Sequence, residues 1–315
     1  LPQAIRANKI TCLRRPEKRQ GHLAQMVPPS MLLCLQPCGM GGNVRGLGRH
    51  PCRSGKYPCL PENLRQLWLR PEHGVGHRLS PSEINYRANI ESLKQLGVTD
   101  IISLSAVGSL KEDLDPGTFV IVDQFIDRTI NRKKSFFENG IVAHVPMAEP
   151  TNKTLRNLSK EILESLNIKH SLGGTYLAME GPHFSSKAES LLYRSWNCDV
   201  IGMTNMPEAK LAREAEIRYA SISMVTDFDS WSSEHEDVDL QMLLETMRKN
   251  IEKSKNFIEN FSNKFFSKID FSSDNTSAIL NTSIVTKHEN WNRETELKLS
   301  NILKRFKQEN NVSSK

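Results

Sequence analysis

Two aspartates separated by one residue follow a predicted strand near the middle of the chain. The strand spans 219–225, and Thr226-Asp227-Phe228-Asp229 comes directly after it. On an extended strand, side chains at positions i and i+2 point to the same side, so Asp227 and Asp229 would act as a pair. Such a pair can recognise adjacent donors on a planar heterocycle, or supply a general acid if burial raises one pKa. A helix N-cap or a metal-binding pair of aspartates has the same spacing.

A second group of polar residues lies in the turn from Glu180 to Ser186, between a predicted strand and a predicted helix. Phe184 can stack on a flat ring, and Ser185 or Ser186 can cap the helix that follows. A capped helix start with a core phenylalanine would give the same pattern, and the residues alone do not separate these interpretations.

Of three further segments, the first and the last could bind an anion. Ser103 to Ser109 offers hydroxyl and backbone N–H groups, although it lacks the lysine of a P-loop. Met203-Thr204 closes another predicted strand, where a methionine is also typical of core packing. His73-Gly74-Val75-Gly76-His77 could hold phosphate or a metal, and a solvated loop is the alternative.

Strands and helices alternate along the part of the chain that carries these residues. This alternation predicts an α/β domain, and several strands end at small or polar residues, where such sheets place ligands. The predicted strands span 100–105, 119–122, 174–179, 199–203 and 219–225. The predicted helices span 85–97, 152–166, 187–195, 207–215 and 238–261, with a short terminal helix over 294–306.

The 315 residues have an ordinary globular composition, with 38% hydrophobic and 25% charged residues and a net charge of +6. This excludes a collagen-like, mucin-like or wholly disordered chain. No apolar run approaches the roughly 18 residues that a membrane helix needs. The leading segment has no compact apolar stretch followed by a small-residue cleavage site, so we expect a cytoplasmic protein without a membrane partner.

The first 72 residues differ from the rest. They hold 12 Lys and Arg against 3 Asp and Glu, a net charge of +9, with five of the six cysteines and nine of the fifteen prolines. A basic arm for nucleic acid, a zinc module and a segment without a stable core are the alternatives. The third is favoured, because few periodic apolar residues are present to offset backbone entropy. One hypothesis is that this segment is translated out of frame. The cysteines that a zinc module would use are Cys34, Cys38, Cys52 and Cys59.

Taken together, the ordered motifs from residue 73 to about 261 resemble the 5′-methylthioadenosine phosphorylases, a family of the trimeric purine nucleoside phosphorylase superfamily. The resemblance implies three parts: an atypical, poorly ordered segment over 1–72, a nucleoside phosphorylase domain over 73–262, and a polar tail with a short helix over 263–315. It also implies a mixed central β-sheet flanked by helices. The motifs that carry it are HGVGHRLSPSEINYRANI, VGSLKEDLDPGTFVIVDQFIDRT, HVPMAEP, EGPHFSSKAES, DVIGMTNMPEAKLAREA and YASISMVTDFDSW.

The resemblance implies a pentosyltransferase reaction. Inorganic phosphate attacks the anomeric carbon of S-methyl-5′-thioadenosine, adenine leaves, and 5-methylthioribose 1-phosphate forms, as part of purine and methionine salvage. No metal or organic cofactor is implied, and phosphate is the co-substrate. The expected assembly is a homotrimer, with no nucleic-acid partner. Phe136, Phe137 and His144 could contribute across the subunit interface or could pack locally.

By the same resemblance, Asp227 would donate a proton to purine N7, and Asp229 would accept a hydrogen bond from the 6-amino group. Phe184 and Ser185 would border the base. The remaining site residues would contact the sugar, the methylthio group and phosphate. Met203 would lie under the ribose, Leu240 and Leu244 would form the methylthio pocket, and His73, Ser105, Ala106 and Thr204 would hold phosphate.

Two departures from the family lie near residue 72. Gly39-Met40-Gly41-Gly42-Asn43 is a poor substitute for the family's glycine-rich phosphate loop, and no apolar strand is expected before it. Glu72 stands where the family has an arginine, with Arg70 two positions earlier. A carboxylate there repels phosphate. We therefore expect weak phosphate binding and slow turnover. The alternative is a catalytically weak or dead homologue that acts as a purine-binding protein.

Overall fold

The computed structural model of the chain describes the backbone of residues 11–12, 30–36, 66–71, 78–232, 240–268 and 274–310. Side chains are described for 78–232, 245–265 and 274–310. His73, Glu72 and the proposed zinc-binding cysteines lie outside the described side chains. Among the helices of the described residues, none is long and apolar enough to span a membrane.

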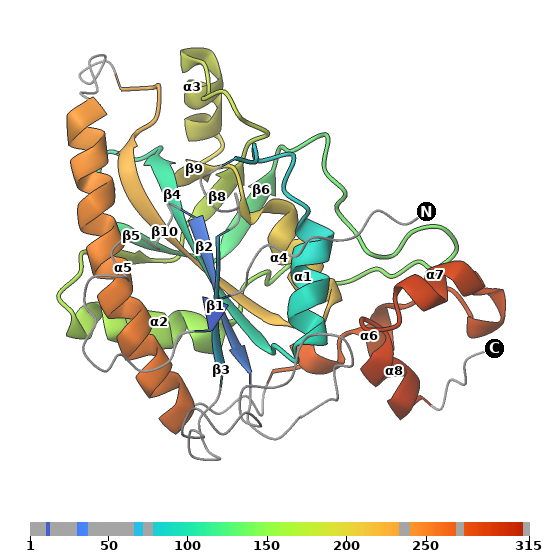
Figure 1. Cartoon of the computed structure of the whole chain (residues 1–315). Helices are drawn as coiled ribbons and strands as arrows, with labels where there is room; N and C mark the ends of the chain where they lie inside the picture. Colours follow the sequence, from blue (N-terminus) through green and yellow to red (C-terminus); the bar gives the residue numbers. More distant parts are fainter. Residues whose placement is uncertain are drawn as a thin grey trace.

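The described strands form one mixed sheet, as the fold-class prediction required (Figure 1). Two central strands, β4 and β10, run parallel, and β10 pairs antiparallel with its other neighbour, β5. In order across the sheet, the strands are β1 (Thr11–Cys12), β3 (Gln66–Pro71), β2 (Ser30–Gln36), β4 (Asp100–Ser109), β10 (Arg218–Phe228), β5 (Phe119–Val122) and β7 (His170–Leu172). A branch leaves the end of β4 through β9 (Val200–Gly202), β8 (Thr175–Ala178) and β6 (Gln124–Asp127).

Helices cover both faces of β4 and β10 (Figure 1). The first core lies between one face and helices α1 (Tyr86–Gln95) and α4 (Asn205–Glu214). The second lies between the other face and helices α2 (Lys153–Ser165) and α5 (Leu240–Lys268). Helix α3 (Lys187–Ser195) stands beyond the end of the sheet. Since both faces are covered, β4 and β10 are buried at most of their positions.

Both central strands are longer than predicted. Strand β4 continues from residue 105 to Ser109, and β10 continues from residue 225 to Phe228. The register shifts between Val225 and Asp227, which leaves Thr226 as a bulge and pairs Asp227 with Gly108. Most of the extra residues, such as Gly108, Ser109 and Asp227, are small or polar, so their own propensity predicts a turn. Pairing between strands that lie far apart in sequence keeps them extended.

The expectation that no apolar strand precedes Gly39 is wrong. Residues Ser30–Gln36 form β2, which pairs with β4. The pairing is antiparallel, however, with Ser30 beside Ser105 and Leu35 beside Asp100. The end of β2 that leads to Gly39 is therefore at the opposite end of β4 from Ser105. The glycine-rich segment 39–43 itself lies outside the described residues.

The sequence prediction also missed the strands β1, β3, β6 and β7, and it merged two helices. Strands β6 and β7 have four and three residues, too few for a clear alternating pattern. The predicted terminal helix over 294–306 is two helices, α7 (Arg293–Lys298) and α8 (Lys304–Glu309), which follow the short helix α6 (Leu280–Ser283). The turn between α7 and α8 buries Ile302 and Leu303 in the first core.

A buried ion pair at the start of the central strands provides a test of this arrangement. The Asp100 side chain is 1% exposed, and Arg218 Nε and Nη2 lie 2.5 and 2.8 Å from its two oxygens. We predict that Arg218→Met lowers the free energy of unfolding by about 3–5 kcal/mol, because it leaves a buried carboxylate without its partner. Urea denaturation measures this. Lys249→Met, which removes an exposed pair with Glu245, is the control and should change little. Equal effects of the two substitutions would contradict the prediction.

Candidate functional site

The candidate site lies where the ends of three neighbouring strands meet. Gly108, near the end of β4, pairs with Asp227 of β10 on one side and with Ile201 of β9 on the other. Because β9 runs antiparallel to β4, the chain that leaves β9 heads back toward Ala106 and Ser105. The sheet thus brings the 227–229 segment and the 203–204 segment, which sequence analysis treated separately, to opposite sides of one strand.

Asp227 and Asp229 share one side of the strand end, as their spacing predicted. A Cβ atom added to Gly108 would lie 3.5 Å from Asp229 Cβ and 3.7 Å from Asp227 Oδ2. Both carboxylates therefore lie over the one residue of β4 that has no side chain. Among the described residues, no cluster of acidic, histidine or cysteine side chains could hold a metal ion.

Ser185 binds Asp229 rather than standing apart from it. Its Oγ lies 2.7 and 2.6 Å from the two carboxylate oxygens, and Asp229 is only 7% exposed. Ser230 Oγ donates in turn to the Ser185 carbonyl, at 2.7 Å. The turn after β8 is thereby joined to the end of β10. Helix capping falls to Ser186, whose capping box with Glu189 opens α3.

The environment of Asp227 differs from that of Asp229. Burial raises the pKa of Asp227 to about 6, and the nearby Asp229 carboxylate adds to this effect. The Thr226 hydroxyl donates to Asp227 Oδ1 and acts in the opposite direction. A carboxyl with this pKa is partly protonated near neutral pH, so Asp227 is suited to general acid work.

Phe184 and Met203 occupy contrasting positions. Phe184 is 81% exposed, which rules out the alternative that it is a core residue. Its ring is free to contact a ligand. Met203 is half-buried against Gly181, and a Cβ at that glycine, whose φ is +67°, would lie 2.6 Å from Met203 Sδ. The close contact packs the loop after β8 against the loop after β9.

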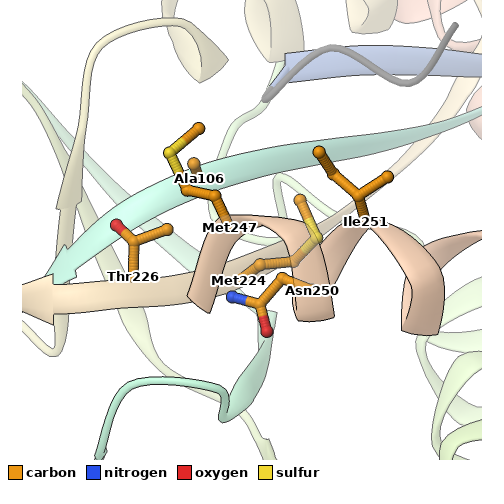
Figure 2. Close-up of a pocket in the computed structure, with 6 residues that line it drawn as sticks. All are labelled: Ala106, Met224, Thr226, Met247, Asn250 and Ile251. Atoms are coloured by element: carbon orange, nitrogen blue, oxygen red, sulfur yellow. The ribbon is translucent and has the colours of Figure 1, made fainter. Parts of the chain in front are cut away.

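The predicted phosphate residues are only partly described. Ser105 Oγ is buried without a hydrogen-bond partner among the described residues, and such a hydroxyl favours a polar ligand or a water. Thr204 is buried at the start of α4, and its N–H donates to Tyr176 Oη at 3.4 Å. Ala106 and Thr226 line a small cavity against α5, shown in Figure 2. Its volume of about 10 Å³ suits at most one water molecule.

The other predicted residues are placed less completely. Leu240 and Leu244 lie in the first turns of α5, which packs against β10, and their side chains are outside the described set. Phe136 and Phe137 are buried in the first core, as the local-packing alternative predicted. His144 is exposed and lines a separate cavity of about 520 Å³.

Sequence reasoning missed one residue of this region. Arg132 lies in the segment after β6, and its guanidinium contacts main-chain carbonyls of both loops that border the site. No motif or periodicity singles it out, because its partners are backbone atoms about 47 to 74 residues away in sequence.

Comparison with known proteins identifies the family of the chain. A family model described as the phosphorylase superfamily matches residues 38–263. S-methyl-5′-thioadenosine phosphorylase of Rhodospirillum rubrum is 57% identical over 198 residues, which cover 63% of this chain and 67% of that protein. The enzyme of the same name from Bradyrhizobium diazoefficiens is 52% identical over 215 residues, covering 68% and 72%. The chain thus spans about two thirds of the length of these relatives.

Solved structures give the same result. A methylthioadenosine phosphorylase from an antarctic soil metagenomic library has a TM-score of 0.67 and 41% identity, covering 74% of this chain and 81% of that one. Methylthioadenosine phosphorylase from Schistosoma mansoni, in complex with adenine, has a TM-score of 0.64 and 34% identity, covering 68% and 82%. From its motifs, its sheet and these matches, the chain belongs to the phosphorylase superfamily, within the family of methylthioadenosine phosphorylases.

Proposed function

We propose that the chain catalyses phosphorolysis of S-methyl-5′-thioadenosine to adenine and 5-methylthioribose 1-phosphate. The observation that carries the proposal is the pair of carboxylates over Gly108, one held by Ser185 and the other with a raised pKa. The relatives that are 57% and 52% identical to this chain are named S-methyl-5′-thioadenosine phosphorylase, after the same reaction. The chain would act as a pentosyltransferase in purine and methionine salvage.

The two carboxylates have complementary tasks in this reaction. As the glycosidic bond breaks, the purine gains negative charge, and protonation at N7 by Asp227 would stabilise the leaving group. Asp229 already accepts a hydrogen bond from the Ser185 hydroxyl, and it would accept another from the 6-amino group of adenine. A 6-oxopurine offers an acceptor at that position, so the pair favours adenine over hypoxanthine.

The rest of the proposed site holds the sugar and the nucleophile. Phe184 would stack on the base, Met203 would lie under the ribose, and the apolar Leu240 and Leu244 would receive the methylthio group, which has no hydroxyl to satisfy. Phosphate would be held by the donors at the ends of β4 and β9, together with an imidazole. These residues are Ser105, Ala106, Thr204 and His73.

The assembly, location and cofactor requirement belong to the same proposal. We expect a cytoplasmic homotrimer that needs inorganic phosphate and no metal or organic cofactor. The exposed Phe184 ring and the exposed His144 are surfaces that a neighbouring subunit would cover. We also propose that residues 1–72 weaken the phosphate half of the site, because β2 runs antiparallel to β4 and Glu72 carries the wrong charge.

We predict that Asp229→Asn changes base selectivity. The amide can donate to a 6-oxo group, so the ratio of kcat/KM for methylthioadenosine to that for methylthioinosine should fall at least about tenfold. Steady-state assays of base release measure the ratio. Asp113→Asn, at an exposed position, is the control and should leave it unchanged. An unchanged ratio in Asp229→Asn would contradict the role of Asp229.

A second prediction concerns pH. If only protonated Asp227 is active, kcat/KM should be level below pH 6 and fall about tenfold per unit above it, since the pKa is about 6. Thr226→Val removes a hydrogen bond that lowers this pKa, so the falling limb should move to higher pH. Thr118→Val is the control, because Thr118 Oγ1 is buried without a partner among the described residues. A limb that stays in place in Thr226→Val, or persists in Asp227→Asn, would refute the assignment.

A third prediction tests the phosphate half of the site. Glu72→Arg should lower the KM for phosphate by about tenfold or more, because a repelling charge becomes an attracting one. Glu62→Arg makes the same charge change ten positions earlier and should have little effect. Isothermal titration with adenine should give the same affinity for all three chains. Adenine binding without turnover in the original chain and in Glu72→Arg would instead support a purine-binding protein.

A further inference from the structure

Arg132 is a buried cation without a close carboxylate partner. Its side chain is 1% exposed, and the nearest contact to a carboxylate is 3.9 Å, from Nε to Glu180 Oε1. Main-chain carbonyls lie closer to the guanidinium and add to this charge compensation. The guanidinium donates to the carbonyls of Glu180 at 2.6 Å, Met206 at 2.7 Å and Met179 at 3.4 Å, and also to that of Met203.

These carbonyls belong to two loops with different tasks in the proposed reaction. Met179 and Glu180 begin the turn that leads to Phe184 and Ser185, on the purine side. Met203 and Met206 flank Thr204, on the ribose and phosphate side. A single planar group is therefore bonded to both loops at once.

Neighbouring contacts hold the guanidinium in its plane. Tyr86 Oη accepts from Arg132 Nη1 at 3.1 Å, and the Tyr86 ring lies with its centroid 5.5 Å from the guanidinium carbon. The Glu180 carboxylate accepts from Ser82 Oγ and from Ile130 N, which closes the segment before Arg132 onto the same turn. The residue is thus fixed from α1 as well as from the two loops.

Only arginine has the donors for this role. Its five N–H groups lie in one plane at fixed angles, whereas lysine presents three donors from a single nitrogen. A lysine at position 132 would keep the charge but could not reach carbonyls of both loops together. Each unpaired carbonyl would then be free to move away from the position that it holds now.

We propose that Arg132 is a positioning residue, which sets the distance and orientation of the purine loop relative to the loop that carries Met203 and Thr204. This inference rests on the proposed function. Ser185 is tied to Asp229 independently of Arg132, so base binding alone depends on it less. Attack on the sugar requires both loops in register, because misplacement of the reacting groups by about 1 Å costs up to roughly 100-fold in rate.

The test compares Arg132→Lys with Arg156→Lys. Arg156 is a mostly buried arginine on α2, with a side chain that is 13% exposed, and it pairs with Asp123 and Glu149 on the opposite face of the sheet. In Arg132→Lys, we expect kcat for methylthioadenosine to fall at least 30-fold while adenine affinity by titration changes less than threefold. Arg156→Lys should alter neither. Methylguanidinium at millimolar concentration should restore part of the activity to Arg132→Ala and none to Arg156→Ala.

Other outcomes are decisive. Equal kcat in Arg132→Lys and the unaltered chain would overturn the inference, and so would parallel losses of kcat and adenine affinity. A lysine variant that does not fold would also overturn it, because the residue would then serve stability. If the unaltered chain binds adenine but releases none from methylthioadenosine at saturating phosphate, the proposed function is wrong. The inference about Arg132 is then also wrong, because it rests on that function.

Discussion

Burial of the Asp227 carboxyl beside Asp229, over Gly108, is the feature on which the rest of the site depends, because it raises the pKa of one carboxyl of the pair. The Ser185 hydroxyl donates to the side chain of Asp229, with Oγ 2.7 and 2.6 Å from its two oxygens. Asp227 is also enclosed, and burial raises its pKa to about 6, although the hydrogen bond from Thr226 acts to lower it. When two neighbouring acidic groups have different surroundings, one can act as a hydrogen-bond acceptor and the other as a proton donor. An aminopurine leaving group requires both, an acceptor for its amino group and a proton donor for its ring nitrogen.

The surrounding fold holds the two aspartates in these positions. The bulge at Thr226 shifts the register of β10 and brings Asp227 opposite Gly108. On the other side of β4, the chain that leaves β9 carries Met203 and Thr204. Burial of both faces of the central strands by α1, α4, α2 and α5 makes this register hard to change. Arg132 adds bonds from its side chain to the main chain of both segments that border the site.

Local sequence predicted the elements better than their ends or their partners. Helix α3 matches the predicted 187–195, and the i, i+2 pairing of Asp227 and Asp229 was expected from strand geometry. The extension of β4 to Ser109, the strand β2 and the bond from Ser185 to Asp229 were not expected, because each depends on chain segments that are distant in sequence. Arg132 was missed for the same reason. The segment 39–43 and His73 remain sequence predictions.

The most direct test of this account is the ionisation of Asp227 itself. Carbon-13 NMR of the aspartate carboxyl groups, followed from pH 3 to pH 9 with Asp227→Asn used to assign the signal, reports the pKa of that one group in the folded chain. The account predicts a midpoint of about 6 for Asp227, well above the ordinary pKa of 3.8 for an aspartate. A midpoint near 4 would show that Asp227 is fully ionised at neutral pH and would contradict its role as the proton donor.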